Sequence, residues 1–359
     1  MNHAEASRWM AHAARIAWRG HGGAEPNPMV GCVIVGADGR FVAEGHHRRC
    51  GGPHAEVEAL RRAGSAARGA TAIVTLEPCN HQGRTGPCSL ALREAGVARV
   101  LYGCPDPNPA ASGGAATLRA AGIAAEHLPH PDAERVTSPF LHRVRTGLPW
   151  VVAKWAESAD GKIATRPGEP RWISGERSRA MVHRERGRVD AVLTGMGTVM
   201  VDDPLLTVRG ARPRRTPVRV AWDPRLGMPT DRALVRTARE VPLVVACTPK
   251  ALEANAIHAQ LLRAAGAEVI AAADEADLMR ILGRRGMSTV LVEAGGGLVG
   301  ALLSRGLVNA AWVFTAAHEL GDVGPRGEAP LGADTLARLD RAWTVRRGDD
   351  RVSLYLFPA

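Results

Sequence analysis

Apolar side chains in the first half of the chain follow two alternating patterns, one typical of helices and one typical of buried strands. Helical spacing runs through residues 7–19 and ends at Gly20. The continuous apolar run at 29–36 is typical of a strand buried on both faces. The same criteria predict further helices at 54–63 and 87–95, and further strands at 70–76 and 99–104. This alternation predicts an α/β layer with substantial parallel pairing.

The second half repeats this alternation after a break near residues 144–150. A domain boundary there gives one domain at 1–146 and another at 147–359. Strands are predicted at 150–156, 190–194, 217–222, 241–247, 267–272, 288–293, 310–316 and 351–357, and helices at 175–187, 250–265, 274–285 and 298–305. Segments 104–114, 202–217 and 318–333 are rich in Pro, Gly, Asp and Arg, so we expect loops that line sites or surface.

The composition narrows the class of protein. An apolar fraction of 45% over 359 residues is enough to build large cores. No apolar run approaches 18 residues, and the N-terminus lacks a basic start followed by an apolar block. We therefore expect no membrane span, no secretory signal and a cytoplasmic location. The six cysteines are too sparse for a disulfide scaffold, and clustered cysteines in a cytoplasmic chain indicate metal binding or catalysis.

The net charge of +10 raises the possibility of a nucleic-acid partner. The basic residues are 43 Arg and only three Lys, and the excess is spread over both halves without a long basic run. Binding or editing of nucleic acid would require a basic track and a base-flipping pocket. The sequence therefore favours small anionic ligands over nucleic acid, and a nucleic-acid-editing protein is kept as an alternative.

Three separated pieces of the first half together indicate a catalytic zinc site. His54 begins a predicted helix, Cys79 follows a strand, and Cys88 begins the next helix. One imidazole and two thiolates form a three-ligand set for one zinc ion, with the fourth position left for an activated water. Glu56 can face the metal without binding it, take the water's proton and pass it to a leaving amine. The order matches the H-x-E…P-C-x-x-C signature of nucleobase deaminases, except that eight residues separate the two cysteines.

Each of these pieces alone is a weak signal, and their order on alternating elements gives them weight. Cys32 lies in an apolar strand and is expected to be a buried structural thiol. No role is assigned to three cysteines without recognisable ligand spacing, Cys50, Cys104 and Cys247. The remaining histidines near the site are expected at the surface or on the substrate side, namely His46, His47 and His81.

The residues of the second half, taken alone, indicate only an α/β domain that could bind a nucleotide. Gly295, Gly296 and Gly297 follow a strand and open a helix, where backbone N–H groups can approach a phosphate. This signal is weak, because glycines at a strand–helix turn are often required by sterics alone. Lys154 lies on an apolar strand, where a charged side chain must be paired or functional.

Four segments of the first half resemble the bifunctional pyrimidine deaminase/reductase family of riboflavin biosynthesis. They are PNPMVG at 26–31, HAEV at 54–57, LEPCNHQGRTGPC at 76–88 and DPNP at 106–109. The resemblance extends over nearly the whole chain in the family's domain order. It implies a cytidine-deaminase-like three-layer α/β/α domain, in which Asn27, Asp106 and Asn108 hold the pyrimidine or its ribose phosphate. Asn27 could instead be a turn residue between prolines.

Four segments of the second half, together with Glu293 and the following glycines, resemble the family's reductase. They are KWAESADGK at 154–162, WIS at 172–174, GMGT at 195–198 and DDPLLTVR at 202–209. The resemblance implies a dihydrofolate-reductase-like α/β domain that uses NADPH, with Lys154 and Asp202 near the reacting ribose. It implies cofactor contacts from Ala156, Trp172, Thr198, Asp202, Gly295, Gly296, Gly297, Leu298, Val299, Gly300 and Ala301. It implies substrate contacts from Arg186, Leu206, Arg209 and Glu293, with the two arginines suited to the 5′-phosphate.

The sequence thus predicts a two-domain enzyme of riboflavin biosynthesis. The first domain would deaminate a phosphorylated pyrimidine, and the second would reduce its ribosyl side chain with NADPH. Homo-oligomerisation, as a dimer or tetramer, is expected from the resemblance. Departures from the family at Pro170, Pro224 and Gly297 leave open a paralogue of a pyrimidine- or pteridine-derived pathway, with an active deaminase and an altered or inactive reductase.

Overall fold

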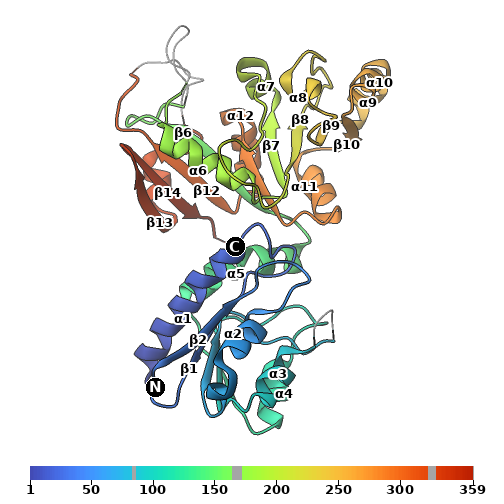
Figure 1. Ribbon diagram of the computed structural model, residues 1–359. Helices are drawn as coiled ribbons and strands as arrows, with labels where there is room; N and C mark the ends of the chain where they lie inside the picture. The colour runs from blue at the N-terminus through green and yellow to red at the C-terminus, as the bar shows by residue number, and fades with distance from the viewer. Residues whose placement is uncertain (83–85, 164–171, 322–328, 359) are drawn as a thin grey trace. The chain divides into compact units, whose positions relative to one another are not determined.

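The computed structural model describes residues 1–82, 86–163, 172–321 and 329–358. The chain divides into two compact units, Met1–Gly147 and Leu148–Ala359, and each has its own sheet (Figure 1). Pro170 and the segment 83–85 of the cysteine-bearing loop, both singled out from the sequence, lie outside the described residues. Within the described ranges, none of the helices combines the length and apolar character needed to cross a membrane.

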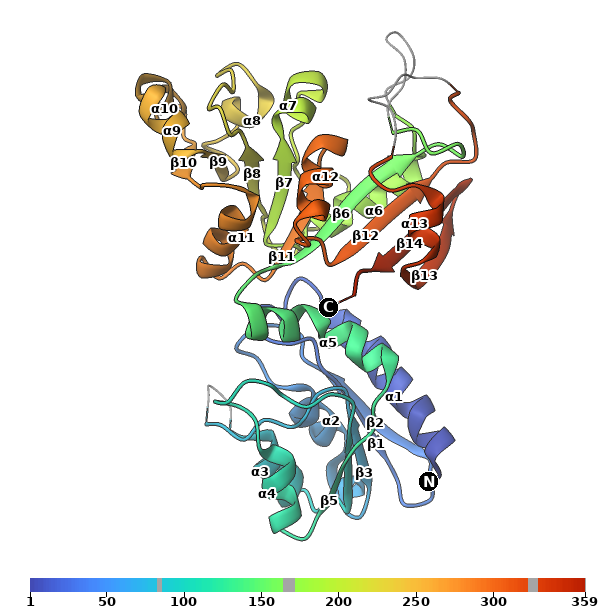
Figure 2. The same cartoon turned by 180° about the vertical axis from the view of Figure 1, so that it is seen from behind.

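The first unit is a five-stranded sheet between two helical layers. Its helices and strands are α1 (His3–Ala17), β1 (Gly31–Val35), β2 (Phe41–His46), α2 (Ala55–Ala63), β3 (Thr71–Val74), α3 (Cys88–Glu94), β4 (Arg99–Tyr102), α4 (Gly114–Ala120), β5 (Ala124–His127) and α5 (Pro131–Thr146). The strand order is β2-β1-β3-β4-β5. The pairs β3–β4 and β4–β5 are parallel, while β1 pairs antiparallel with both of its neighbours. Helices α1 and α5 cover one face, and α2, α3 and α4 cover the other (Figures 1 and 2).

The core of the first unit follows from the apolar pattern. Every residue of β1 is buried, as its continuous apolar run predicted, and this includes Cys32. Helix α1 turns Met10 and Ile16 into the same core. It begins earlier than the apolar spacing predicted, because Asn2 forms a capping box in which its side chain accepts from the Glu5 N–H and Glu5 accepts from the Asn2 N–H.

The second unit is a nine-stranded sheet of order β10-β9-β8-β7-β11-β6-β12-β14-β13. Its elements are β6 (Trp150–Glu157), α6 (Glu176–Arg186), β7 (Ala191–Gly195), α7 (Met196–Asp202), β8 (Val218–Trp222), α8 (Ala233–Arg236), β9 (Leu243–Cys247), α9 (Pro249–Ala254), α10 (Ala256–Ala264), β10 (Glu268–Ala271), α11 (Glu275–Arg284), β11 (Thr289–Glu293), α12 (Gly296–Ser304), β12 (Ala310–Thr315), α13 (Ala333–Ala337), β13 (Asp340–Arg347) and β14 (Asp350–Leu356). Seven strands are parallel, and β14 and β13 extend the sheet antiparallel.

Successive residues of the central strands enter cores on opposite faces of this sheet. On β7, Val192 packs into the core that α6 and α10 share, while Ala191 and Leu193 pack into the core of α11 and α12. This two-sided burial explains the continuous apolar runs from which the parallel strands were predicted. Parallel pairing brings the carboxyl ends of β6, β7 and β11 to one edge, where ligand sites of open parallel sheets form.

Several elements were not predicted, and one prediction was wrong. The unpredicted elements are β2, α4, β5, α5, α7, α8, α13 and β13. The single helix predicted at 250–265 is two helices, because Asn255 interrupts α9 and α10 with a non-helical backbone. Helix α5 was not predicted because Pro139 lies inside it, and proline normally ends a helix.

Candidate functional site

The three predicted zinc ligands converge in the first unit. His54 is the residue that caps α2, Cys79 lies in the loop after β3, and Cys88 is the first residue of α3. The Nδ1 atom of His54 lies 3.2 Å from the Cys88 Sγ and 3.5 Å from the Cys79 Sγ. The Cys88 N–H donates to the Cys79 sulfur over 3.4 Å. The candidate ligand atoms all lie within 4.8 Å of one another.

These separations fit a single tetrahedral zinc ion. With Zn–S and Zn–N bonds of about 2.3 and 2.0 Å, tetrahedral ligand atoms lie roughly 3.3–3.8 Å apart. The separations from the His54 Nδ1 to the two sulfurs fall at or close to that interval. One imidazole and two thiolates also suit zinc chemically and leave one position for water or substrate. Among the described residues, this is the one cluster of at least three such side chains with metal-binding geometry.

The pKa values of the two thiols, Cys79 and Cys88, are shifted in opposite directions. A hydrogen bond from the Cys88 thiol lowers the pKa of Cys79, and the nearby His54 lowers it further. The shared hydrogen bond and burial raise the pKa of Cys88. Glu56 is 4% exposed, and burial raises its pKa to about 7, with the charge of Cys79 adding to the effect. A buried carboxyl next to the ligand set can therefore bind and release a proton near neutral pH.

A cavity of about 170 Å³ opens onto this ligand set. Asn27, Asp106 and Asn108, the three residues expected to hold a pyrimidine, all line it together with Glu56. The Asp106 side chain accepts from the Asn108 N–H over 2.9 Å, which shapes the loop after β4. Burial raises the pKa of Asp106. The predicted loop at 104–114 thus lines the site, as its composition suggested.

Glu77 holds that loop in place, although no separate sequence signal marks it for this role. One of its carboxylate oxygens accepts from the Asp106 N–H over 3.3 Å, and the other accepts from the Ala115 N–H over 3.1 Å. Glu77 therefore ties the end of β3 to the loop after β4 and to the start of α4. It also lines the cavity itself.

His47 was expected at the surface or on the substrate side, and it is a buried wall of this cavity. It is 2% exposed, and its ring meets the His54 ring edge-on with centroids 5.2 Å apart. Its Nδ1 lies 2.9 Å from the Pro53 carbonyl oxygen, which can only accept, so this nitrogen carries the proton. Burial lowers the pKa of His47 and favours the neutral ring, so its Nε2 accepts from the Asn27 amide over 3.3 Å. Asn27 is thereby oriented by His47. His81 lines the same cavity from an exposed position, and His46 is half-buried outside the cavity lining.

The second unit holds a larger cavity, of about 470 Å³, at the carboxyl edge of its parallel strands. Most of the residues expected to contact cofactor or substrate line it, namely Lys154, Ala156, Trp172, Arg186, Thr198, Asp202, Leu206, Arg209, Glu293 and Gly295. The others lie on the first turns of α12, namely Gly296, Gly297, Leu298, Val299, Gly300 and Ala301. The side chain of Val299 is fully buried in the core, so only its backbone can face a ligand.

Lys154 is positioned by the sheet register. It pairs with Glu293 on β11 and with Trp312 on β12, and its Nζ lies 5.3 Å from the centroid of the Phe314 ring. Burial lowers the pKa of Lys154, while the charges of Glu293 and Asp202 act in the opposite direction. Lys154 therefore lies in the cavity wall as a buried lysine, and the neighbouring carboxylates only partly offset the effect of burial on its pKa.

Arg186 and Glu293 form an ion pair in the cavity wall. The Arg186 Nη1 also donates to the Thr207 carbonyl over 3.0 Å, so the arginine connects α6 to the loop that carries Leu206 and Arg209. Burial acts to raise the pKa of Glu293, but the charge and hydrogen bonds of Arg186, together with the charge of Lys154, lower it below its ordinary value. The positive charge of Arg186 is therefore compensated within the protein.

The start of α12 and the loop after α7 complete the cavity. The Gly295 N–H donates to the Thr198 hydroxyl over 3.1 Å, which joins two of the predicted cofactor contacts. Leu206 is buried with a positive φ of 52°, an uncommon conformation for leucine that marks a tightly constrained loop. Arg179 and His183 of α6 also line the cavity and were not singled out from the sequence. The Arg179 guanidinium lies 5.3 Å from the centroid of the Trp172 ring.

Each of the two units matches a known protein family. Residues 3–104 match the cytidine and deoxycytidylate deaminase zinc-binding region, and residues 149–348 match the RibD C-terminal domain. The riboflavin biosynthesis protein RibD of Actinobacillus pleuropneumoniae is 38% identical over 93% of this chain and 89% of its own length. RibD of Escherichia coli K12 is 41% identical over 87% of this chain and 88% of its own length.

Solved structures agree over the whole chain. RibD of Acinetobacter baumannii superposes with a TM-score of 0.80 at 34% identity and covers 100% of both chains. A diaminohydroxyphosphoribosylaminopyrimidine deaminase/5-amino-6-(5-phosphoribosylamino)uracil reductase of Thermotoga maritima gives a TM-score of 0.78 at 29% identity and covers 99% of both chains. The family and the two fold classes expected from the sequence are confirmed. This chain belongs to the RibD family of riboflavin biosynthesis, with a zinc-binding deaminase region followed by a reductase domain.

Proposed function

We propose that the first unit deaminates 2,5-diamino-6-ribosylamino-4(3H)-pyrimidinone 5′-phosphate and that the second unit reduces the ribosyl side chain of the product to ribityl. The observation that carries this proposal is that each unit has its own cavity, and that the two cavities are lined by residues suited to different reactions. His54, Cys79 and Glu56 line one cavity, next to Cys88 of the ligand set, and Lys154 and Asp202 line the other. We assign the deaminase to residues 1–146 and the reductase to residues 147–359.

In the deaminase, Glu56 moves the proton. One zinc ion per chain, held by His54, Cys79 and Cys88, would supply Lewis acidity and an activated water. The Glu56 carboxylate would hold the proton of the attacking water and pass it to the departing exocyclic amine, which would leave as ammonia. Its burial and its place on the first turn of α2, beside His54, support this role.

Asn27, Asp106 and Asn108 orient the pyrimidine in the deaminase. The amide of Asn27 is fixed by His47, so its oxygen is the acceptor presented to the ring. Asp106 and Asn108 belong to one hydrogen-bonded loop on the cavity wall and hold the ring or its ribose phosphate. No arginine or lysine is among the described residues that line this cavity, which argues against an extended nucleic-acid track.

In the reductase, NADPH would supply the hydride for C1′ of the ribosylamino group. The residues present fit a dinucleotide, because α12 begins with Gly296 and Gly297 after its cap Gly295, and a phosphate can approach the backbone N–H groups of its first turn. Cofactor contacts are assigned to Ala156, Trp172, Thr198, Asp202 and the segment from Gly295 to Ala301. The family departures at Pro224 and Gly297 do not alter Lys154, Asp202 or Glu293.

The substrate contacts of the reductase are Arg186, Leu206, Arg209 and Glu293. Lys154 and Asp202 position and polarise the reacting ribose. Because Arg186 is paired with Glu293, we assign the main phosphate contact to Arg209, which is exposed at the cavity. The cytoplasmic location and the homo-oligomeric state stay predictions from the sequence.

Two variants test the assignment of chemistry to units. Glu56→Ala should keep about one zinc per chain and lose ammonia release by roughly 10²–10⁴-fold, because only the proton shuttle is removed. Lys154→Met should release ammonia at the wild-type rate and lose NADPH oxidation with the deaminated intermediate. Retained deamination in Glu56→Ala would overturn the deaminase mechanism. Ammonia release by the wild-type protein without any NADPH oxidation would instead favour a paralogue with an altered reductase.

A further inference from the structure

The separation of Cys79 and Cys88 along the chain does not by itself bring their two sulfurs to one metal ion. In a C-x-x-C segment, a two-residue turn is enough to bring both sulfurs to one metal ion. Here eight residues, 80–87, separate Cys79 from Cys88. A segment of that length can span roughly 26–29 Å when it is extended, so its length alone does not fix the distance between the two sulfurs. Other contacts must hold the two ligand-bearing backbone segments together.

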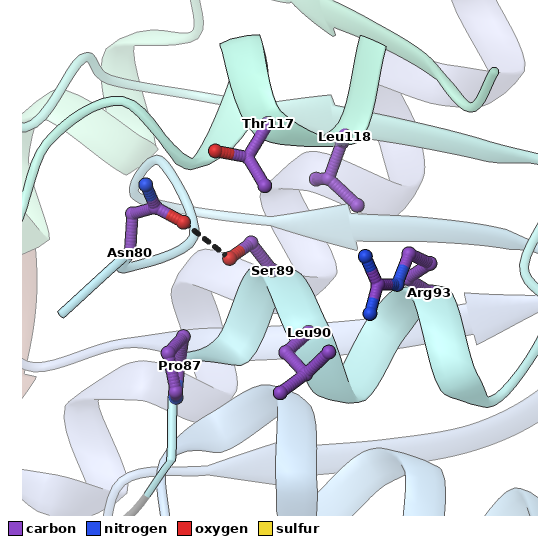
Figure 3. A pocket seen from close by; sticks show the side chains of 7 residues that line it. All are labelled: Asn80, Pro87, Ser89, Leu90, Arg93, Thr117 and Leu118. Carbon is purple, nitrogen blue, oxygen red and sulfur yellow. Dashed lines mark hydrogen bonds between the residues drawn. The ribbon is translucent and has the colours of Figure 1, made fainter. Parts of the chain in front are cut away.

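The residues that follow each cysteine provide such a contact. The Ser89 hydroxyl donates to the Asn80 Oδ1 over 2.8 Å (Figure 3). The Ser89 N–H also donates to the Cys79 carbonyl over 3.2 Å. Ser89 is 1% exposed, so this hydrogen bond is protected from water at one end. The side-chain bond therefore joins positions directly adjacent to the two sulfur ligands.

The Asn80 end of this bond is itself anchored. The Asn80 N–H donates to the Ala111 carbonyl over 2.8 Å, so the residue is held against the loop that carries Asp106 and Asn108. Figure 3 shows Asn80 and Ser89 facing one another, with Thr117 of α4 above their bond in this view. A cavity of about 70 Å³ lies beside them and is lined by these residues and by Leu90 and Arg93. The bond thus belongs to a packed junction between the first turn of α3 and α4.

We propose that Asn80 and Ser89 are positioning residues for the zinc site, and we call their side-chain bond the Asn80–Ser89 clip. The clip sets the separation of the Cys79 and Cys88 sulfurs in place of the short turn of a C-x-x-C segment. Partners that orient metal ligands typically change metal affinity by about 10–100-fold when they are removed. This inference rests on the zinc role of His54, Cys79 and Cys88.

The test measures how fast the holoenzyme gives up zinc to a chromogenic chelator. Asn80→Ala and Ser89→Ala should each accelerate zinc loss by about 10–100-fold. The double variant should lose zinc no faster than the faster single variant, because both changes break the same bond. Asn80→Asp keeps the acceptor oxygen and should restore slow release. Ser138→Ala is the matched control, since it removes a hydroxyl on α5 that donates to the Glu134 carbonyl in its own helix.

A spectroscopic readout separates positioning from general stability. In the cobalt-substituted protein, Asn80→Ala should change the ligand-field and thiolate-to-cobalt absorption bands, whereas Ser138→Ala should leave them unchanged. Wild-type zinc release and an unchanged cobalt spectrum in Asn80→Ala would overturn the clip, and so would additive effects in the double variant. Because Asn80 is exposed, its variants test the proposal even if Ser89→Ala fails to fold. A wild-type protein that binds no zinc would overturn the zinc role itself, which is a distinguishable result.

Discussion

Arg186 and Glu293 meet through two parallel hydrogen bonds, with Nε 2.5 Å from Oε1 and Nη2 2.8 Å from Oε2. Both side chains are only about a tenth exposed, at 12% and 11%. The pair joins α6 to the end of β11, and the Thr207 carbonyl extends the connection to the loop of Leu206 and Arg209. Two residues expected from the sequence to touch substrate therefore also determine the shape of the cavity.

Breaking this pair from one side should be costly. Glu293→Gln removes the charge that compensates the buried Arg186 and should lower the free energy of unfolding of the reductase unit by about 3 kcal/mol, at the lower end of the range for buried pairs. Urea denaturation followed by a probe in the second unit measures this loss. The double variant Arg186→Met/Glu293→Leu should be less destabilised than the sum of the single changes. Additive losses would show that the two residues act independently.

The same pair should give the reductase unit a dependence on acid pH. The pKa of Glu293 lies below its ordinary value of 4.5, because the charge and hydrogen bonds of Arg186, together with the charge of Lys154, outweigh the effect of burial. The unfolded chain then binds this proton more readily, so the pair's contribution is fully present above about pH 4.5 and is lost as the pH falls through the folded pKa. The difference in melting temperature between wild type and Glu293→Gln should shrink below pH 4.5. A constant difference from pH 6 to pH 3 would contradict this.

The sequence predicted the fully buried strands well, because strands buried on both faces need continuous apolar runs. Strands β1, β7 and β9 are buried at every position. Edge strands lack this signal: β13 is mostly exposed, and β2 alternates buried and partly exposed residues around Gly45. Such strands are specified by pairing with a neighbour, which a single segment of sequence does not reveal.

The candidate site was predicted best where chemistry restricts the residue type. A zinc site accepts few side chains, so the sequence alone singles out His54, Cys79 and Cys88. His47 and Glu77 act through backbone carbonyl and N–H groups that only the folded chain brings near, and such partners have no sequence spacing of their own. For the same reason, the family resemblance implied that Arg186 and Glu293 each contact substrate without revealing that they bind each other.

Removing zinc should separate the two activities. Stripping the protein with a strong chelator should abolish ammonia release and leave NADPH oxidation intact, because all three metal ligands lie in the first unit and the described residues that line the larger cavity belong to the second. Both rates are measured on the same stripped sample, and added zinc should restore deamination. Chelator already saturated with zinc is the control. A parallel loss of both activities would argue against two separate sites.

Lys154 should give the reductase an alkaline limit. Burial lowers the pKa of this lysine from its ordinary value of 10.5, and we expect the protonated form to polarise the substrate. The rate of NADPH oxidation should therefore fall with rising pH at a midpoint below 10.5. The deaminase rate of the same preparation serves as the reference, since Lys154 belongs to the second unit and lines the other cavity. An alkaline limb at or above 10.5 would mean that Lys154 is not the group that titrates.

Gly114 should be indispensable for the backbone around the zinc loop. A Cβ at Gly114 would lie 1.8 Å from the Pro78 carbonyl oxygen, and a backbone atom cannot rotate out of the way. Gly114→Ala must therefore displace either the start of α4 or the segment that carries Cys79. We expect a loss of about 1–3 kcal/mol in stability, the usual cost of overpacking, together with faster release of zinc to a chelator. Gly86→Ala is the control, because its Cβ would approach the Gln82 Oε1 no closer than 4.0 Å. Equal melting temperatures and equal zinc release in the two variants would show that the close approach of α4 to Pro78 does not constrain the site.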